Sequence, residues 1–226
     1  MKKKLYICDF DGTVTLQDVT DTLMIASGGD KWMNAGKLYD DKKIWHKTMN
    51  RHFARLLKLG PTEVGTYVKS NIKIRPGFNE FAEKCKKNSI PLIIASSGWD
   101  IYIRTLLHKL DPYFVDTIDE YEPEDLGYRP AVIANRIAYD TDAQRWELHF
   151  PFPKYQCRIS SPCKGMIARR YIGKGFKVYA IGNSYSDICM AKNANRIFTT
   201  GSLTDICRKL HLSYTPFTDF FQIPAI

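Results

Sequence analysis

Short apolar segments alternate with amphipathic helical segments along most of this 226-residue chain. Strands that alternate with helices predict an α/β fold, a doubly wound, Rossmann-like and mostly parallel sheet. In such sheets, ligands bind beyond the carboxyl ends of the strands. The expected strands are residues 5–8, 92–95, 115–118, 177–181 and 197–198. The expected helices are residues 76–87, 101–110, 164–172 and 202–210.

Residues 17–71 have a different character, because apolar residues recur there at helical spacing between Gly and Pro breaks. We expect them to form a small helical cap inserted after the first strand. Residues 1–16 plus 72–226 would then form the core. Residues 132–139 and 146–150 resemble two strands around a polar turn. The role of residues 128–160 stays open between an extra hairpin beside the site and a lid on the sheet.

The chain has a formal net charge of +9, which favours an anionic partner. Its densest basic run is only Lys2 to Lys4, so we expect no nucleic-acid partner. Six cysteines occur without a CxxC pair or zinc-finger spacing, which is typical of reduced thiols in a cytoplasmic protein. The longest apolar runs are too short to span a bilayer, so we expect no membrane association. The oligomeric state stays open between monomer and homodimer.

The segment DFDGT at residues 9–13 follows the first predicted strand directly. In extended backbone, Asp9 and Asp11 point the same way, and their carboxylates repel unless a cation or a proton intervenes. Mg²⁺ prefers such oxygen ligands. Gly12 permits a sharp turn that brings backbone N–H groups, including that of Thr13, near an anion. An ordinary turn at the end of a strand would also explain these residues.

Polar residues follow two further predicted strands. Ser96 comes directly after the apolar run 92–95. Its hydroxyl and the N–H groups of Ser97 and Gly98 would hold a phosphate at a helix N-terminus. A helix N-cap is the alternative role for Ser96. Lys164 opens a predicted helix, an unfavourable place for a cation unless an anion lies nearby.

The segment GNSYSD at residues 182–187 ends the third of these strands. Asn183 offers an uncharged oxygen to a hard metal ion. Asp187 falls in the first turn of the next predicted helix, where a carboxylate either supports the helix dipole or joins the site. Together these strand ends predict one shared site at one edge of the sheet.

These segments, in this order, resemble the motifs of the haloacid dehalogenase superfamily of phosphatases. The first motif is DFDGTVT at residues 9–15, followed by Ser96, Lys164 and residues 182–187. The helical insertion is similar to the cap of the phosphoserine-phosphatase-like branch. Within it, SSGWD at 96–100 and the closing residues 214–223 look like methionine-salvage phosphatases that act on 2-hydroxy-3-keto-5-methylthiopentenyl-1-phosphate.

The resemblance implies roles for the site residues. Asp9 would attack phosphorus and form an aspartyl-phosphate, and Asp11 would exchange protons with the leaving oxygen and with water. Mg²⁺ would be held by Asp9, Asp11, Asn183 and Asp187, while Lys164, Ser96, Ser97, Gly98, Gly12 and Thr13 would hold the phosphate. Two departures matter, because Asn183 stands where the family usually has Asp, and Ser97 replaces a Gly.

The expected function is therefore a Mg²⁺-dependent phosphatase of a small phosphorylated metabolite. Phosphoserine or another small phosphate ester is the alternative substrate, and a non-catalytic phosphate-binding module is the alternative class. Three residues are expected near the substrate by position: Asp18, Trp99 and Asp100.

Overall fold

We describe the chain from a computed structural model, for residues 3–27 and 29–225. An eight-stranded sheet runs in the order β3-β4-β2-β1-β6-β7-β8, and β5 pairs with β4 outside this path. All of these pairings are parallel except that of β4 with β5. The strands are β1 (Lys4–Cys8), β2 (Leu92–Trp99), β3 (Tyr113–Phe114), β4 (Ala131–Asp140), β5 (Arg145–His149), β6 (Lys177–Gly182), β7 (Arg196–Thr199) and β8 (Thr215–Pro216). The predicted α/β class with a doubly wound sheet is confirmed.

Nine α-helices lie within the described residues. They are α1 (Val19–Ser27), α2 (Lys31–Asp40), α3 (His46–Leu56), α4 (Pro61–Asn71), α5 (Phe78–Lys87), α6 (Asp100–Leu106), α7 (Lys164–Gly173), α8 (Ile188–Ala191) and α9 (Gly201–Lys209). Short 3-10 helices lie at η1 (His108–Leu110), η2 (Pro123–Leu126), η3 (Tyr185–Asp187) and η4 (Phe220–Gln222). None of the helices in this part of the chain is both long and apolar enough to cross a bilayer.

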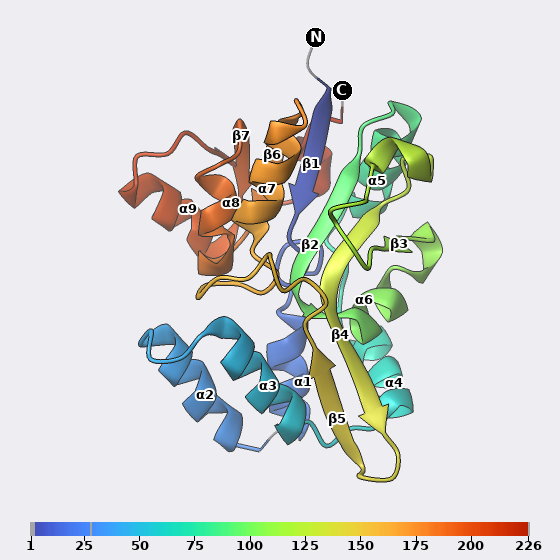
Figure 1. Cartoon of the computed structure of the whole chain (residues 1–226), viewed down its shortest axis with the longest axis vertical. Helices are drawn as coiled ribbons and strands as arrows, with labels where there is room; N and C mark the ends of the chain where they lie inside the picture. The colour runs from blue at the N-terminus through green and yellow to red at the C-terminus, as the bar shows by residue number, and fades with distance from the viewer. Residues whose placement is uncertain (1–2, 28, 226) are drawn as a thin grey trace.

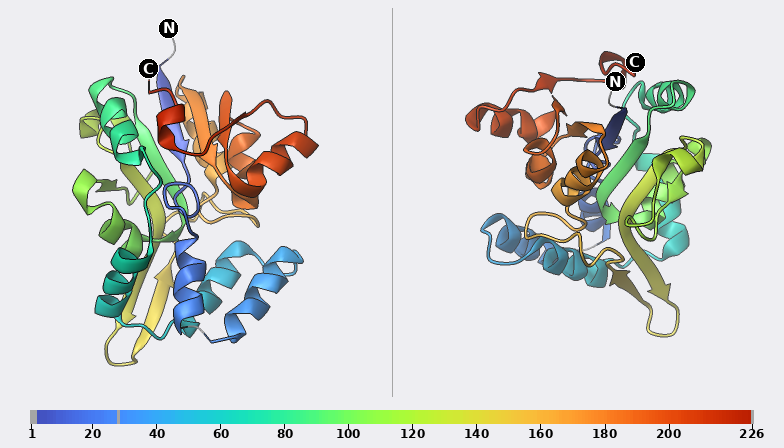
Figure 2. Two further views of the ribbon diagram at one scale, coloured as in Figure 1. Left: turned by 180° about the vertical axis from the view of Figure 1, so that it is seen from behind. Right: turned by 45° about the horizontal axis from the view of Figure 1, so that its top comes forward.

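The sheet is buried on both faces, as the near-continuous apolar sequence of β1 predicts. Alternate side chains of a strand point to opposite faces. Tyr6 therefore lies in a core shared with α5 and α6, whereas Ile7 lies in a second core shared with α7. Figures 1 and 2 show α7 on one face of the sheet and α5 on the other.

Helices α1, α2 and α3 lie together at the end of the molecule toward which β1 points, beside the β4–β5 hairpin (Figure 1). The fourth helix of the predicted insertion, α4, packs beside α6. Trp146 of β5 donates a hydrogen bond of 2.8 Å from its indole nitrogen to the carbonyl of Leu59, which joins α3 to α4. Residues 131–149 of the segment 128–160 thus form an extended hairpin against the helical insertion, while the division into core and cap stays a prediction.

Three predicted boundaries were wrong. Strand β2 continues through Ser96 to Trp99, because its far end pairs with β4 across a register shift. Residues 115–118 are not a strand; β3 lies at Tyr113–Phe114 instead. The last turn of the helix expected over 101–110 is a separate 3-10 turn, η1.

Candidate active site

A cavity of about 410 Å³ lies between the carboxyl ends of the central strands and the helices α1 to α3. Its lining comes from both sources, so one wall belongs to the sheet and the other to the inserted helices. The residues that line it are Asp9, Asp11, Asp18, Thr20, Asp21, Trp32, Gly36, Tyr39, Asp40, His46, Met49, Asn50, Phe53, Ser97, Gly98, Lys164, Ser184, Tyr185, Ser186 and Ser202.

A buried ammonium lies between two buried carboxylates at the base of the cavity. Lys164 is 1% exposed, and its Nζ lies 2.5 Å from Asp9 Oδ1 and 2.6 Å from Asp187 Oδ1. Burial opposes the charge of Lys164, but the two carboxylates outweigh it and the pKa of the ammonium is raised. Burial and the nearby Asp187 raise the pKa of Asp9 to about 7, although Lys164 acts in the opposite direction. Motifs far apart in sequence thus meet, as the strand ends predict.

Hydrogen bonds of the local backbone hold Asp9, Lys164 and Asp187 in place. Asp9 follows β1, and its N–H donates to the carbonyl of Ile181 at the end of β6 (2.9 Å). Lys164 is the first residue of α7, as predicted. Asp187 ends the 3-10 turn η3, and its Oδ2 accepts from the N–H groups of Asn183 (2.9 Å) and Ser184 (3.1 Å). Asp187 therefore orients Lys164 while its other oxygen holds the loop after β6.

Asp11 lies two residues beyond Asp9 and faces the same cavity. Its Oδ1 accepts from the N–H of Val19 (3.0 Å), and its Oδ2 accepts from the hydroxyl of Tyr102 (2.8 Å). Burial, followed by the charges of Asp18 and Asp9, raises the pKa of Asp11 well above its usual range. Asp11 is thus biased toward its protonated form, in which it can donate a proton.

The segment after the apolar part of β2 carries a correction. Ser96 does not cap a helix: it lies inside β2, and α6 begins four residues later. Its Oγ accepts from the N–H of Gly98 (2.9 Å) and lies 3.3 Å from Asp11 Oδ2. Ser97 and Gly98 line the cavity, and the buried hydroxyl of Ser97 has no partner within the described residues. A Cβ on Gly98 would fall 2.5 Å from Asp11 Oδ2, so only glycine fits this approach.

The turn after Asp11 is closed by its own hydrogen bonds. The N–H of Gly12, at φ +70°, donates to the carbonyl of Gln17 (3.0 Å) and to Thr15 Oγ1 (3.1 Å). Thr13 donates its hydroxyl to Asn183 Oδ1 (3.2 Å). Neither Gly12, Thr13 nor Asn183 lines the cavity, so each would have to exchange a bond or move to reach a ligand.

Of the three residues expected near a substrate, only Asp18 lines the cavity. Trp99 is fully buried and donates its indole N–H to Asn50 Oδ1 (2.6 Å). Asp100 accepts from the N–H of Ile137 (3.0 Å) and pairs with Arg136 (3.5 Å), both on β4. Trp99 and Asp100 therefore serve the packing of β2 and α6 rather than the cavity.

Several cavity residues were missed by the sequence reasoning. Asn50 is buried and donates to the carbonyl of Ser97 (2.7 Å), and His46 is buried with its Nδ1 unpartnered within the described residues. Burial lowers the pKa of His46 to about 4, which keeps the ring neutral. The available signal was the spacing of His46, Asn50 and Phe53 along one face of α3, since polar side chains on a buried face point to a function.

The cavity is crowded with carboxyl groups. Among the described residues that line it, Lys164 is the only Lys or Arg and faces five aspartates. The aspartates are Asp9, Asp11, Asp18, Asp21 and Asp40. Burial and neighbouring carboxylates raise the pKa of Asp21 to about 7, a sign of this crowding. Hard oxygen donors with excess negative charge fit a divalent cation such as Mg²⁺, which would balance both the carboxylates and an anionic ligand.

Comparison with known proteins finds similar proteins along nearly the whole chain. The family model described as haloacid dehalogenase-like hydrolase matches residues 6–192. The chain is 25% identical to 2-hydroxy-3-keto-5-methylthiopentenyl-1-phosphate phosphatase of Bacillus cytotoxicus over 220 residues, covering 96% of this chain and 92% of the relative. It is 27% identical to the protein of the same name from Geobacillus thermodenitrificans over 230 residues, covering 99% and 95%.

A solved structure of phosphoserine phosphatase, an analogue of its phospho-aspartyl intermediate, superposes with a TM-score of 0.68. The two chains are 20% identical, and the match covers 99% of this chain and 98% of the other. At that identity the likeness supports the fold alone, while the family match covers most of the chain. The chain therefore belongs to the haloacid dehalogenase-like hydrolase family, as one of its phosphatases.

Proposed function

We propose that this protein is a Mg²⁺-dependent phosphomonoesterase that acts on a small phosphorylated metabolite through a phosphoryl group carried on Asp9. The observation that carries the proposal is the buried contact of 2.5 Å between Asp9 and Lys164 at the base of the cavity, with Asp11 two residues away. A carboxylate held beside a fixed cation is a positioned nucleophile, and the same cation can bind the phosphoryl oxygens.

In the first step, a carboxylate oxygen of Asp9 attacks phosphorus, and the bond from phosphorus to the ester oxygen breaks. Asp11 gives its proton to that leaving oxygen, which its raised pKa favours. In the second step, Asp11 takes a proton from water as the water oxygen attacks the phosphoryl group. The bond to Asp9 then breaks, phosphate leaves, and both carboxyl groups return to their starting forms.

The remaining contacts divide between the phosphate and the cation. Lys164, Ser97 and Gly98 line the cavity and are the proposed phosphate contacts, with Ser96 placing Asp11 and Gly98. Asp9 and the backbone of Asp11 would hold Mg²⁺ at the base of the cavity. Asn183 and Asp187, which do not line the cavity, would join them after exchanging one of their present hydrogen bonds. When bound, this ion offsets the repulsion between the carboxylates and the phosphate and polarises the phosphoryl oxygens.

The substrate end of the cavity is partly apolar. Trp32, Met49 and Phe53 line it from α2 and α3, and a thioether packs well against aromatic side chains. This lining suits the methylthio chain of the substrate named for the Bacillus cytotoxicus relative. Phosphoserine suits it less, because among the described lining residues no arginine is present to pair with a free carboxylate. We therefore propose 2-hydroxy-3-keto-5-methylthiopentenyl-1-phosphate as the substrate and phosphoserine as the alternative.

The first test is hydrolysis of para-nitrophenyl phosphate by the purified chain, with and without Mg²⁺. We expect turnover that requires Mg²⁺ and is lost in Asp9→Asn, which removes the nucleophilic charge while keeping the side-chain shape. The unfolding midpoint of that variant should show that it remains folded. Equal turnover by a folded Asp9→Asn would exclude the mechanism.

The second test compares kcat/KM for the methylthiopentenyl phosphate and for phosphoserine. Met49→Asp should reduce kcat/KM for the former much more than for para-nitrophenyl phosphate, because it places a charge against the methylthio chain. Phosphate binding by the wild-type chain without turnover of any of these esters would instead favour a non-catalytic phosphate-binding module.

A further inference from the structure

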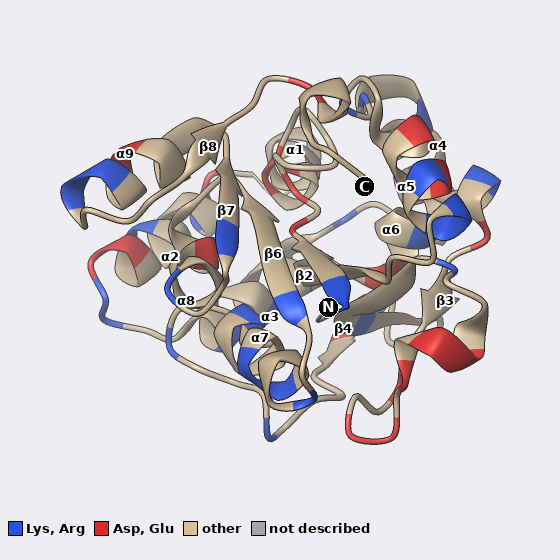
Figure 3. Ribbon diagram, turned by 90° about the horizontal axis from the view of Figure 1, so that it is seen from above, with Lys and Arg blue, Asp and Glu red and all other residues tan. Residues whose placement is uncertain are grey.

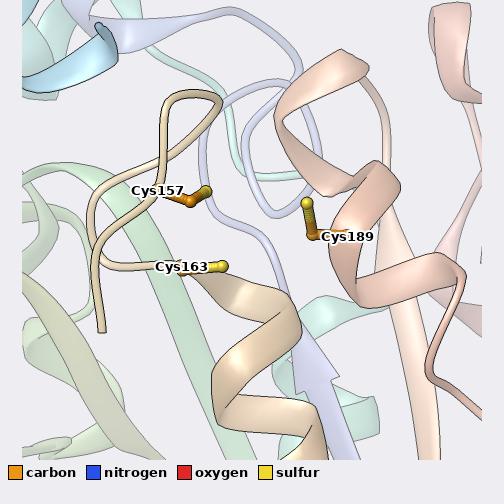
Figure 4. A group of neighbouring side chains, drawn as sticks. All are labelled: Cys157, Cys163 and Cys189. Atoms are coloured by element: carbon orange, nitrogen blue, oxygen red, sulfur yellow. The ribbon is translucent and has the colours of Figure 1, made fainter. Parts of the chain in front are cut away.

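Three cysteines from separate segments meet beside the active site. Cys157 lies in the loop between β5 and α7, Cys163 immediately precedes α7, and Cys189 lies on α8. Their sulfur atoms all lie within 4.8 Å of one another. In Figure 4 the side chains of Cys157 and Cys163 extend toward Cys189, which lies opposite them. All three thiols are free.

The backbone around the cluster is shaped to bring these sulfurs together. A Cβ on Gly165 would fall 2.7 Å from Cys189 Cβ and 2.6 Å from its carbonyl oxygen, so glycine allows α7 to approach α8 this closely. The loop folds back on itself, since the N–H of Cys157 donates to the carbonyl of Ser160 (3.2 Å). In return, the N–H of Ser160 donates to Cys157 Sγ (3.4 Å). An N–H aimed at a sulfur stabilises a thiolate, the form that binds metals.

The chemistry of this cluster differs from that of the cavity. The cavity offers hard oxygen donors, whereas the cluster offers three soft sulfur donors. In a tetrahedral zinc site with Zn–S bonds of about 2.3 Å, the sulfurs lie roughly 3.8 Å apart. Since the three sulfurs all lie within 4.8 Å of one another, they need to approach by at most about 1 Å to reach that geometry. Cys157 and Cys189 are partly exposed, so a water molecule can reach a fourth position.

We propose that Cys157, Cys163 and Cys189 bind one Zn²⁺ ion through three thiolates, with water as the fourth ligand. Binding forms three Zn–S bonds and releases the three thiol protons to solvent. The ion would tie the loop, the first turn of α7 and α8 together. Lys164 follows Cys163 directly and Asp187 lies two residues before Cys189, so the ion would brace the buried pair without contacting a substrate.

The test is a Co²⁺ titration of the reduced, metal-free full chain, because Co²⁺ bound to thiolates gives a charge-transfer absorption that oxygen ligands do not. We expect a thiolate band that saturates at one ion per chain and disappears on addition of one equivalent of Zn²⁺. Asp9→Asn should retain the band, which separates this site from the proposed Mg²⁺ site and from the phosphatase function.

Serine substitutions at the cluster are compared with one at a cysteine outside it. Cys157→Ser and Cys189→Ser should weaken binding more than about 100-fold, beyond the loss typical of partners outside the coordination sphere. Cys207→Ser, at a buried cysteine of α9, should leave binding unchanged. Because Cys163 is buried, serine at this position can disturb the fold, so circular dichroism is used to check that Cys163→Ser is folded. Cys157 is only half buried, so Cys157→Ser is expected to keep the fold and tests the site independently.

Three results would overturn the proposal. One is the absence of a thiolate band in the reduced wild-type chain. Another is a band that survives in folded Cys157→Ser. The third is a purified chain in which two of these cysteines form a disulfide, seen as a mass two hydrogens below that of the reduced chain, and which binds no metal after the disulfide has been reduced.

Discussion

Tyr102 holds the proposed acid–base residue in place. Its hydroxyl donates to Asp11 Oδ2 and also lies 3.0 Å from Thr20 Oγ1 on α1. The bond favours the charged form of Asp11 and so lowers a pKa that burial has raised. Tyr102 of α6, which does not itself line the cavity, therefore tunes the proton transfer from behind Asp11.

We expect Tyr102→Phe to lower kcat about tenfold, the effect of one lost hydrogen bond of about 1.4 kcal/mol. The first step needs protonated Asp11, so activity falls as pH rises through its pKa. Removing the hydroxyl raises that pKa further and moves the alkaline limb of the kcat/KM profile to higher pH. Tyr113→Phe, at a half-exposed tyrosine outside the cavity, is the control. An unchanged alkaline limb would contradict the role of Tyr102.

His46 predicts how stability depends on pH. Burial lowers its pKa from 6.5 to about 4, so the unfolded chain binds a proton at pH values where the folded chain does not. The free energy of unfolding is therefore highest above about pH 6.5 and falls as the pH is lowered toward 4. His46 alone accounts for a fall of about 2 kcal/mol between pH 7.5 and pH 5. In His46→Gln, the free energy of unfolding measured with urea should fall by about 2 kcal/mol less over the same interval. Equal losses in both proteins would mean that His46 titrates normally.

A third residue-scale prediction concerns the metal. Asn183→Asp adds a carboxylate next to the proposed Mg²⁺ ligands, so half-maximal activation should need less Mg²⁺. Asn193→Asp, at a residue outside the cavity lining, is the control for added charge. An identical Mg²⁺ titration for wild type and Asn183→Asp would show that position 183 does not contribute to the ion.

At the residue scale, sequence reasoning succeeded where chemistry is concentrated in short motifs. Asp9, Asp11 and Lys164 could be placed together because each lies at a strand end or helix start. His46, Asn50 and Tyr102 could not, since their roles depend on how α3 and α6 pack against β2. Trp99 and Asp100 failed for the same reason, because their positions follow from the unpredicted extension of β2.

At the scale of elements, the approach of α7 to α8 depends on one glycine. Gly165→Ala would place its Cβ 2.6 Å from the carbonyl oxygen of Cys189. Because that oxygen belongs to the backbone of α8, the two helices must move apart to relieve the clash. We expect a loss of about 1–3 kcal/mol in the free energy of unfolding and a fall in kcat as Lys164 shifts. Both are measured by urea unfolding and by phosphatase assay.

The same helix supplies the control. A Cβ on Gly173, the last residue of α7, would meet nothing within 4 Å. Gly173→Ala should therefore leave activity intact and slightly raise stability, since alanine favours helices more than glycine does. Similar losses in both variants would mean that general helix effects, and not the contact with α8, explain Gly165.

Element positions were predicted well where apolar runs had clear polar ends, as at β1 and β6. They were predicted poorly where pairing partners decide the ends. β2 extends because β4 continues beside it, and β3 is short because it lies at the edge of the sheet. Neither partner is visible in the local sequence.

At the scale of the whole molecule, the C-terminal segment returns to pack over α5. Phe220 is 1% exposed, and its ring lies 5.1 Å from that of Phe78. Asn88 and Tyr6 donate hydrogen bonds to the carbonyls of Ala225 and Pro224. This closure was not predicted, because the segment contains only the two-residue strand β8 and a 3-10 turn.

We expect Phe220→Ala to lower the free energy of unfolding by about 3–5 kcal/mol through the cavity it leaves. Phe221→Ala is a neighbouring control, because Phe221 is 62% exposed and should cost little. Urea unfolding of both variants gives the comparison. A small effect at Phe220 would mean that the segment contributes little to the core.

Charge is spread over the molecule rather than gathered in one sequence run. Viewed from above, acidic residues mark the η2 region while basic residues end α5 and α9 (Figure 3). The ends of α5 and α9 carry cations where they complement the helix dipoles. The expectations of no nucleic-acid partner and of a cytoplasmic location stay predictions.

The hydrogen bonds of Asn50 tie the helical insertion to the strand that carries Ser97. This side chain of α3 is joined to both the carbonyl of Ser97 and the indole of Trp99. Any separation of α3 from β2 would break both buried bonds, at about 1 kcal/mol each, and would also remove the apolar burial of Phe53. One amide therefore keeps the two walls of the cavity in fixed register, so a substitution at Asn50 would disturb both walls together.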